Sequence, residues 1–387
     1  MKHIENIPQD ECTGCGGCIA VCPKDAVTMG TDEYGNYRPQ IDPHKCVDCQ
    51  RCTQFCAQIH AAPKKAPLQV YGAVGNTADL VSKSSSGGVF ATVAAALIEQ
   101  KGQVYGAASQ CVEGKLQVYH QGASNMQEMQ KMQGSKYVQS RAWEVYRAVS
   151  RSLQKGQTVL FTGTPCQVAA VKAYTGDPDN LITIDLVCHG VPAAQMLNEA
   201  LALFAKRLRG KVTDFAFRDK SKEKQFTSRL TLRKGRGTKT YFVRARYLSF
   251  YNAFLQGDNY RESCYSCRYA GMDRVSDITI GDYWGMQKHH GHQMQGREDW
   301  SCVLVNTEKG SAFLAQYGKD LTLVESKPQW VAEQNGQLRA PGAKGPHRAR
   351  LLALYKKGGY KAVEKAFVKE NGGPLRYRRR LYKSLQQ

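Results

Sequence analysis

The chain of 387 residues lacks any apolar run that could cross a lipid bilayer. Its longest such run, VFATVAAALI at 89–98, is about half the length of roughly 20 residues that a transmembrane helix needs. The first residues, MKHIENIPQDEC, contain no apolar segment of the kind found in signal peptides. We therefore expect a cytoplasmic protein without a transmembrane segment.

Acidic residues are also scarce: 33 Asp and Glu stand against 54 Lys and Arg, which gives a formal net charge of +21. Residues 339–387 carry +12 of this charge. A basic surface favours anionic partners such as nucleic acid, an anionic membrane, an acidic protein or an anionic cofactor. The densest cluster, RYRRRLYK at 376–383, matches no recognisable nucleic-acid-binding motif, so we expect no nucleic-acid partner and interpret it as a solvated helix face. The oligomeric state stays open.

Two linkers divide the chain. AAPKKAP at 61–67 follows a short, cysteine-dense segment, 1–62, and RAPGAKGP at 339–346 begins a short, basic, helical tail, 339–387. Strand and helix patterns alternate between the linkers, which predicts an α/β core with parallel pairing, whereas 212–250 predicts an antiparallel insertion. The expected elements are a helix over 87–102, a strand over 103–109, mostly helix over 125–155, a strand, loop and helix over 158–174, a buried strand over 181–190 and a helix over 193–208.

Fourteen cysteines are present, and eight of them form two runs, CTGCGGCIAVC at 12–22 and CVDCQRCTQFC at 46–56. In C-x2-C-x2-C-x3-C runs the first three cysteines bind one [4Fe–4S] cluster, and in two-cluster ferredoxins the fourth binds the other cluster. By this analogy the chain holds two clusters. The first would be bound by Cys12, Cys15, Cys18 and Cys56, and the second by Cys46, Cys49, Cys52 and Cys22.

Zinc knuckles or a disulfide framework are the alternatives for these eight cysteines. Zinc motifs normally pair C-x2-C units across a longer gap, and a reducing cytosol disfavours disulfides, so we favour iron–sulfur clusters. Residues 1–62 resemble bacterial-type 2[4Fe–4S] ferredoxins, which conduct single electrons. The first run ends in Cys-Pro as that pattern does, but the second ends in Cys56-Ala57 and lacks the proline.

Six cysteines remain, and four of them are placed to share a site. Cys166 and Cys188 each follow an expected strand, and the loops at the carboxyl ends of parallel strands converge. Cys264 and Cys267 form a further C-x2-C pair. From spacing alone, a third cluster, a zinc site and unliganded thiols all remain open. Cys111 and Cys302 lie in strand-like runs and are interpreted as ordinary buried residues.

The rest of the chain, from about 70 to 320, resembles the β subunit of coenzyme F420-reducing hydrogenase, a family that includes F420-dependent dehydrogenases and 7-hydroxymethyl chlorophyll a reductase. The stretches that carry the resemblance are SSSGGVF at 84–90, MQGSKYVQSR at 132–141, FTGTPCQVAAVK at 161–172, DLVCHGVP at 185–192, CYSCRYA at 264–270 and SDITIGDYWG at 276–285. The resemblance implies FAD and a third [4Fe–4S] cluster on Cys166, Cys188, Cys264 and Cys267. It also implies an N-terminal flavin-binding part, 70–155, and a C-terminal part with the third cluster, 156–325. The expected fold class is α+β, with a ferredoxin-like module, a mixed α/β flavin-binding core, an antiparallel β portion and the short helical tail.

No GxGxxG fingerprint is present, so the resemblance alone implies where FAD would bind. SSSGG at 84–88 would by itself be typical of a simple helix cap. The implied flavin contacts are Ser85, Ser86, Gly87, Gly88, Ser135, Lys136, Tyr137, Thr162, Gly163, Thr164 and Gln167. His189 is a weak candidate for proton delivery, with a hydrogen bond to a carbonyl as the alternative. Asp277 and Asp282 flank a short buried run, and one of them could face the site.

These features predict an iron–sulfur flavoenzyme. Electrons would pass between the ferredoxin clusters and FAD, and FAD would exchange electrons with an organic two-electron acceptor such as the anionic coenzyme F420. The direction of flow is open, because cluster potentials span about a volt. The expected protein partner is an electron carrier, such as a ferredoxin or another component of a redox complex. The alternative is a non-catalytic electron-relay subunit, and the basic tail fits the docking of an acidic ferredoxin.

Overall fold

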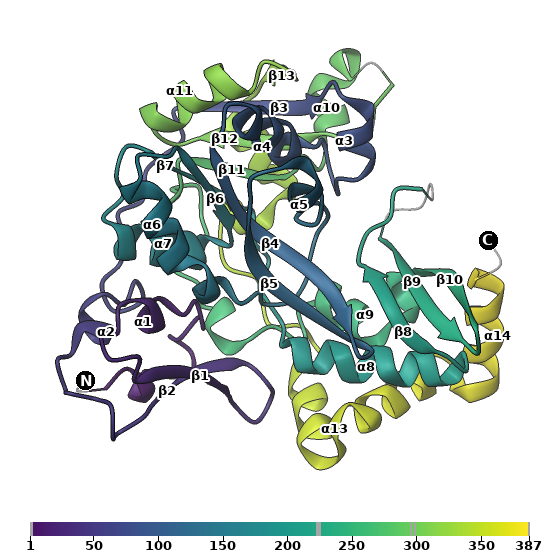
Figure 1. Ribbon diagram of the computed structural model, residues 1–387. Helices are drawn as coiled ribbons and strands as arrows, with labels where there is room; N and C mark the ends of the chain where they lie inside the picture. The colour runs from purple at the N-terminus through teal and green to yellow at the C-terminus, as the bar shows by residue number, and fades with distance from the viewer. Residues whose placement is uncertain (1–2, 222–225, 295, 298, 386–387) are drawn as a thin grey trace.

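The computed structural model describes residues 3–221, 226–294, 296–297 and 299–385. It confirms the predicted fold class, because a ferredoxin-like N-terminal module adjoins a large mixed sheet flanked by helices (Figure 1). An antiparallel three-stranded sheet and the C-terminal helices form the other side of the molecule. In the described part of the chain, no helix combines the length and apolar character that crossing a bilayer requires.

The N-terminal module repeats its own structure. Strands β1 (Val27–Thr31) and β2 (Tyr37–Ile41) pair antiparallel. The short helices α1 (Gly17–Ala20) and α2 (Arg51–Gln54) begin at equivalent positions of the two cysteine runs, and η1 (Ile4–Asn6) precedes them. The sequence repeat is therefore also a repeat of local structure.

The core is an eight-stranded sheet with the order β13-β3-β12-β11-β7-β6-β4-β5. The central strands β4, β6, β7 and β11 run parallel, and the outer strands pair antiparallel. Both predicted parts of the core, 70–155 and 156–325, contribute strands to this one sheet. The strands are β3 (Gln69–Gly75), β4 (Gln103–Val112), β5 (Lys115–Ala123), β6 (Val159–Gly163), β7 (Leu181–Leu186), β11 (Ile278–Asp282), β12 (Ser301–Val305) and β13 (Leu321–Glu325).

Helices cover both faces of the sheet, where the central strands present apolar side chains on either side. In β6, Leu160 packs with α4 (Val89–Glu99) and α11 (Glu308–Tyr317), whereas its neighbours Val159 and Phe161 pack with helices on the opposite face. Those helices are α6 (Tyr146–Gln154) and α7 (Pro165–Thr175). Shorter helices complete the layers: α3 (Ala78–Ser82), α5 (Met126–Gln130), α10 (Met286–His290), η5 (Gly291–Gln293), α12 (Pro328–Gln334) and η6 (Gly336–Leu338).

The antiparallel insertion predicted over 212–250 is present as a separate sheet. It contains β8 (Lys211–Ala216), β9 (Thr227–Lys234) and β10 (Gly237–Arg244), in the order β10-β9-β8. The long β4–β5 hairpin reaches from the core sheet to this region (Figure 1), where Leu116 of β5 packs in the same apolar cluster as α8. The helices around it are α8 (Ala194–Arg207), η3 (Ala245–Tyr247), α9 (Ser249–Gln256), α13 (Arg348–Glu370) and α14 (Gly373–Leu385).

The tail, 339–387, is neither short nor simply a solvated helix face. It forms two helices, and α13 is kinked at Gly358–Gly359, where Gly359 has a φ of 61°. The side chains of Tyr360, Tyr377 and Leu381 are buried against the antiparallel part of the molecule. Apolar residues spaced along the helices explain the difference, because they bind the basic tail to the fold.

The stretch 125–155 is less helical than predicted. Only α5, α6 and the short η2 (Ala142–Glu144) are helical. Arg141 instead lies beside β5, where its backbone N–H donates to the carbonyl of Val118. The sequence pattern also missed β5 itself, which follows a two-residue turn at Glu113 and Gly114, both with positive φ. Tertiary pairing outweighed the helical propensity of this Met- and Gln-rich stretch.

Candidate functional site

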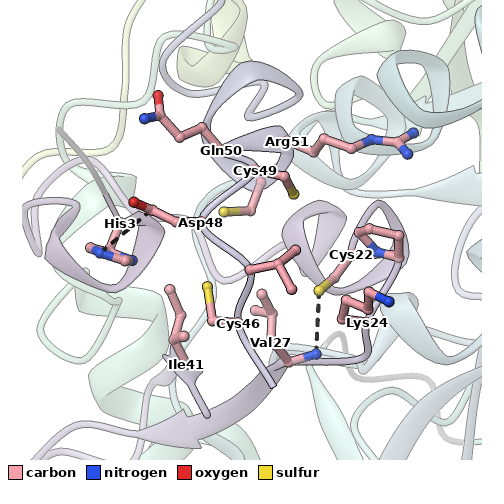
Figure 2. A pocket seen from close by; sticks show the side chains of 14 residues that line it. His3, Cys22, Lys24, Val27, Ile41, Cys46, Asp48, Cys49, Gln50 and Arg51 are labelled. Atoms are coloured by element: carbon pink, nitrogen blue, oxygen red, sulfur yellow. Dashed lines mark hydrogen bonds and ion pairs between the residues drawn. The ribbon is translucent and has the colours of Figure 1, made fainter. Parts of the chain in front are cut away.

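The eight N-terminal cysteines form two groups. Cys22, Cys46, Cys49 and Cys52, here called the outer cysteine group, line one pocket whose lining comes entirely from residues 3–52. Figure 2 shows Cys22, Cys46 and Cys49 around the same space. The backbone N–H of Ala26 donates to the Cys22 sulfur at 3.3 Å, a bond of the kind that stabilises a thiolate. The second pocket is lined by the inner cysteine group: Cys12, Cys15, Cys18 and Cys56.

Each pocket thus receives three cysteines from one run and the fourth from the other. This crossing is the arrangement that the two-cluster ferredoxin spacing predicts. Matching positions of the two loops share left-handed backbone, with φ of 60° and 77° at Gly14 and Gly16 and of 52° and 57° at Asp48 and Gln50. Compact loops that present four thiols to one space fit a [4Fe–4S] cluster. Among the described residues, no His, Cys, Asp or Glu side chains are grouped as ligands of a single metal ion.

The core cysteine group lies on loops at the carboxyl ends of the central strands. Cys166 is the second residue of α7, directly after β6, and Cys188 follows β7. Cys264 ends the short helix η4 (Glu262–Cys264), and its sulfur accepts from the backbone N–H of Val191 at 3.4 Å. Burial raises the pKa of Cys188, and the nearby thiols of Cys264 and Cys267 raise it further. The structure therefore brings the four predicted ligands together, and a shared cluster stays a prediction.

The inner cysteine group adjoins the core cysteine group. Burial raises the pKa of Cys166, and its next largest influence is Cys15 of the inner group. Tyr146 lies at this junction, where its hydroxyl donates to the carbonyl of Cys15 at 3.0 Å. Tyr269 also lies there and donates to the carbonyl of Ala57 at 2.6 Å. The cysteines thus form a series of outer, inner and core groups.

Buried hydrogen bonds fix the module to the core beside the inner group. The amide of Gln139 donates to the carbonyls of Thr13 and Gly14, both at 2.8 Å. Arg261 holds Gln139 through a 2.6 Å hydrogen bond to its side-chain oxygen, and also donates to the carbonyl of Tyr37 at 3.0 Å. Gln139 and Arg261 are 5% and 3% exposed, so water does not compete for these bonds. The module is therefore positioned with its inner cysteine group against the core.

The predicted flavin contacts of the segment 84–88 are engaged within the protein. The hydroxyl oxygen of Ser85 accepts from the backbone N–H and the hydroxyl of Ser135 at 2.7 and 2.8 Å. Ser86 donates to the carbonyl of Trp300, and the N–H of Gly87 donates to the hydroxyl of Ser301, both at 2.9 Å. The bonds of Ser85 join the segment to 134–138, the second stretch predicted to contact the flavin.

Two glycines of this segment have structural reasons of their own. A Cβ at Gly87 would collide with backbone atoms of Ala73 and Ser301. Gly88 is the N-cap of α4 with a φ of 81°, and no side chain caps this helix. The N-terminal N–H groups of an uncapped helix can bind an anion.

Lys136 is not a solvated surface lysine. Its ammonium group donates to the carbonyls of Met132 and Gln133 at 2.8 and 2.9 Å, near the end of α5. Burial lowers the pKa of Lys136 to about 7. Tyr137 packs among aromatic rings, with its ring centroid 4.6 Å from that of Phe254. Both stay predicted flavin contacts.

The loop after β6 connects the core cysteine group with the segment 134–141. Thr164 is the N-cap of α7, and its N–H donates to the side chain of Gln167 at 3.0 Å. Gln167 donates onward to Ser140. The carbonyl of Thr162 lies 3.0 Å from Nε2 of the buried His120, and Gly163 ends β6. This loop is suited to couple a cofactor to Cys166, because it touches both regions.

Sequence reasoning missed an ionic cluster beside these loops. Arg218, just after β8, donates to the carboxylate of Asp282 at 2.7 Å, and its guanidinium lies 5.9 Å from the Trp284 ring centroid. Lys220 donates to the carbonyl of Ser86 at 2.6 Å, and so contacts a predicted flavin segment. No local motif announces Arg218, because only the fold of the antiparallel insertion brings it to the core sheet.

The two flagged aspartates have different surroundings. Asp277 is buried and accepts from the backbone N–H and hydroxyl of Thr183 at 2.8 and 2.6 Å, which is a structural role. Asp282 lies at the end of β11 with Arg218. His189 is exposed; partial desolvation lowers its pKa, and the nearby Asp282 carboxylate opposes that shift. Of the two aspartates, Asp282 is the one near the predicted site.

Comparison with known proteins agrees with this arrangement. Residues 156–329 match the family described as the C terminus of the beta subunit of coenzyme F420 hydrogenase/dehydrogenase. Residues 11–58 match the 4Fe-4S dicluster domain. The chain belongs to the family of F420 hydrogenase/dehydrogenase β subunits and carries a dicluster ferredoxin domain. It is therefore an iron–sulfur protein, related to electron-transfer subunits.

Individual relatives match parts of the chain. The F subunit of the F420H2 dehydrogenase of Methanosarcina mazei is 24% identical over 196 residues, which are 48% of this chain and 56% of that protein. The B subunit of the Na+-translocating ferredoxin:NAD+ oxidoreductase complex of Acetobacterium woodii is 44% identical over 45 residues, 12% of each chain. The chain thus spans little more than half of the first relative and a small part of the second.

Among solved structures, the chain is similar to one from the F420-reducing [NiFe] hydrogenase complex of Methanosarcina barkeri. The similarity has a TM-score of 0.45 and 17% identity, and it covers 79% of this chain and 93% of that one.

Proposed function

We propose that this protein is an iron–sulfur flavoprotein oxidoreductase. It passes single electrons between ferredoxin-type clusters and FAD, and it reduces or oxidises an organic two-electron acceptor such as coenzyme F420. The observation that carries the proposal is the series of cysteine groups, in which the inner group adjoins four core cysteines at the carboxyl ends of central strands. A simple ferredoxin would need no such core group.

The residues around the core group fit a flavin nucleotide. The uncapped N-terminus of α4 at Gly88 suits a pyrophosphate, and the hydroxyls of Ser85 and Ser135 suit the polar edge of the cofactor. Lys136 supplies a cation with no carboxylate among its hydrogen-bond partners in the described part of the chain. Bound FAD would supply the exchange between one-electron and two-electron chemistry.

The chain's own residues would divide the remaining tasks. Cys166, Cys188, Cys264 and Cys267 hold the core cluster, and the loop from Thr162 to Gln167 keeps that cluster beside the flavin. Arg218, held by Asp282 and stacked on Trp284, orients a carbonyl or anionic group of the acceptor. His189 is positioned near Asp282 to hold a proton at its ring nitrogen.

An electron relay is the second candidate function. It is favoured by the names of the relatives, which are subunits of an F420H2 dehydrogenase and of a Na+-translocating ferredoxin:NAD+ oxidoreductase complex. In a relay, the electrons would leave to another protein of the complex, and no soluble acceptor would react.

Anaerobic absorbance spectroscopy of the purified full chain separates these functions. Reduced ferredoxin is added first, and the flavin band should bleach; F420, NAD+ and NADP+ are then added separately, and one of them should restore it. Bleaching that no acceptor reverses would favour the relay. The absence of bound flavin would contradict the proposed enzyme.

A matched pair of variants tests the electron route in the same assay. Cys188→Ser should stop bleaching by ferredoxin, whereas dithionite should still bleach the flavin directly. Cys111→Ser, a half-buried cysteine of β4 outside all three cysteine groups, should behave as the parent protein. Equal behaviour of the two variants would contradict the role of the core group.

A further inference from the structure

The two N-terminal cysteine groups differ in their access to solvent. The pocket of the inner group includes Ala170 of the core helix α7, and Cys12 is only 7% exposed. The pocket of the outer group has no lining residue from the core. There Cys49 is exposed and the neighbouring Val47 is 58% exposed. An electron carrier can therefore approach the outer group much more closely than the inner one.

Uncompensated positive charge borders the outer pocket. Lys24 and Arg51 line it and are exposed, and Figure 2 shows both beside the outer cysteines. The acidic side chains nearby are matched, since Asp48 lies 3.8 Å from His3 and Asp42 lies 3.6 Å from Lys45. Within the described residues, neither Lys24 nor Arg51 has a carboxylate partner, and Arg51 instead lies over the ring of Phe55 at 5.8 Å.

We propose that this outer face, defined by Lys24, Val47, Cys49, Gln50 and Arg51, is the docking surface for an acidic one-electron carrier protein. An exposed apolar residue flanked by unpaired cations suits a carrier whose own redox centre is surrounded by carboxylates. One electron leaves the reduced centre of the carrier, which is thereby oxidised, and reduces the cluster held by the outer cysteine group. Two such encounters supply the two electrons that reduce one FAD. This inference rests on the proposed function and names its protein partner by chemistry.

The basic tail, in contrast, is not the docking site for the carrier. Helix α14 packs on β10, and the Tyr377 hydroxyl donates to the carbonyl of Tyr247 at 2.6 Å. In Figure 1, α14 and the N-terminal module lie on opposite sides of the molecule. A carrier bound to α14 would be far from every cysteine group, and electron tunnelling requires short distances between redox centres. The expectation that the tail docks an acidic ferredoxin is therefore replaced by docking at the outer face.

Charge reversal at two matched places tests the proposal. The full chain is prepared anaerobically as the parent protein, as Lys24→Glu/Arg51→Glu, and as Arg379→Glu/Arg380→Glu on α14. Both double variants change the net charge equally, at exposed positions. Binding of an oxidised, acidic 2[4Fe–4S] ferredoxin is measured by calorimetry at low salt, so that the readout needs no turnover.

The outer-face variant should bind the ferredoxin about tenfold more weakly and with a smaller salt dependence. The α14 variant should bind within about twofold of the parent, since its lost attraction acts only over a long distance. Equal weakening in both variants, or weakening in the α14 variant alone, would overturn the proposal.

Cofactor content separates this result from a failure of the proposed function. Iron and flavin per chain should be unchanged in both variants, and dithionite should bleach the flavin in both. If the flavin were absent or could not be reduced in the parent protein, the proposed function would fail, whereas the binding comparison would still decide where the carrier docks.

Discussion

The two cysteine loops of the N-terminal module share a backbone but not their surroundings. Gly14 and Gly16 of the inner loop and Asp48 and Gln50 of the outer loop all adopt positive φ. In the inner loop, a Cβ at Gly16 would lie 2.5 Å from Trp143, whereas Gln50 carries a full side chain exposed to solvent. The backbone conformation therefore tolerates a side chain, and contact with the core is what requires glycine at position 16.

This difference gives the module its direction. A sequence repeat alone makes the two cysteine groups equivalent, but Gln139, Arg261 and Trp143 contact the inner loop. The outer loop is left for a partner. Glycine in one repeat and charged or amide residues at the matching positions of the other thus mark which loop is packed and which is exposed.

The largest effect is expected from making the inner loop like the outer one. Gly16→Gln should destabilise the protein by about 3 kcal/mol, because a side chain at positive φ would also overpack against Trp143. The matched variant Gln50→Gly should change stability by less than about 1 kcal/mol. Anaerobic thermal unfolding, followed by absorbance of the iron–sulfur bands, measures both. Similar shifts in the two midpoints would contradict the comparison.

An intermediate effect is expected from removing the link between module and core. Arg261→Ala should cost about 2 kcal/mol, because it leaves buried acceptors on Gln139 and Tyr37 without their donor. Arg51→Ala in the outer loop should cost less than about 0.5 kcal/mol, since Arg51 is exposed. Limited proteolysis near the linker 61–67 gives a second readout, and faster cleavage is expected for Arg261→Ala alone. A parent-like cleavage rate would show that the module is fixed by other contacts.

The smallest effect is expected from a single hydroxyl at the junction. Tyr146→Phe should lower stability by about 1 kcal/mol, because the carbonyl of Cys15 loses a buried hydrogen bond. The comparable change in the outer loop is Thr53→Val, which removes a hydroxyl that donates to the carbonyl of Gln50 at 2.7 Å. The outer loop should lose no more stability than the inner one, as judged by the same thermal midpoints. A larger loss for Thr53→Val would reverse the assignment of packed and exposed loops.

Cysteine spacing predicted the grouping of residues that lie far apart in the chain. Cys56 joins the inner group and Cys22 the outer group, as the ferredoxin pattern requires. The parallel centre of the sheet was also predictable, because the strands over 158–163 and 181–186 are rich in apolar, β-branched and aromatic residues. Neither result depends on contacts with distant parts of the chain that the sequence pattern does not encode.

Other features depend on such distant contacts and were missed. The segment after α5 lacks helix because Arg141 pairs beside β5. Arg218 reaches Asp282 only through the placement of the antiparallel sheet. The tail helices pack through Tyr360 and Tyr377, whose local sequence looked like a solvated basic face. Each miss involves a partner far away in sequence, which local propensity and periodicity do not represent.

The central claim is that the core cysteine group holds a third cluster beside a flavin. Counting iron, sulfide and FAD per chain in anaerobically purified protein tests it most directly. Three [4Fe–4S] clusters and one flavin predict about twelve iron atoms, about twelve sulfides and about one FAD per chain. About eight iron atoms per chain would contradict the core cluster, and the absence of FAD would contradict the flavoenzyme.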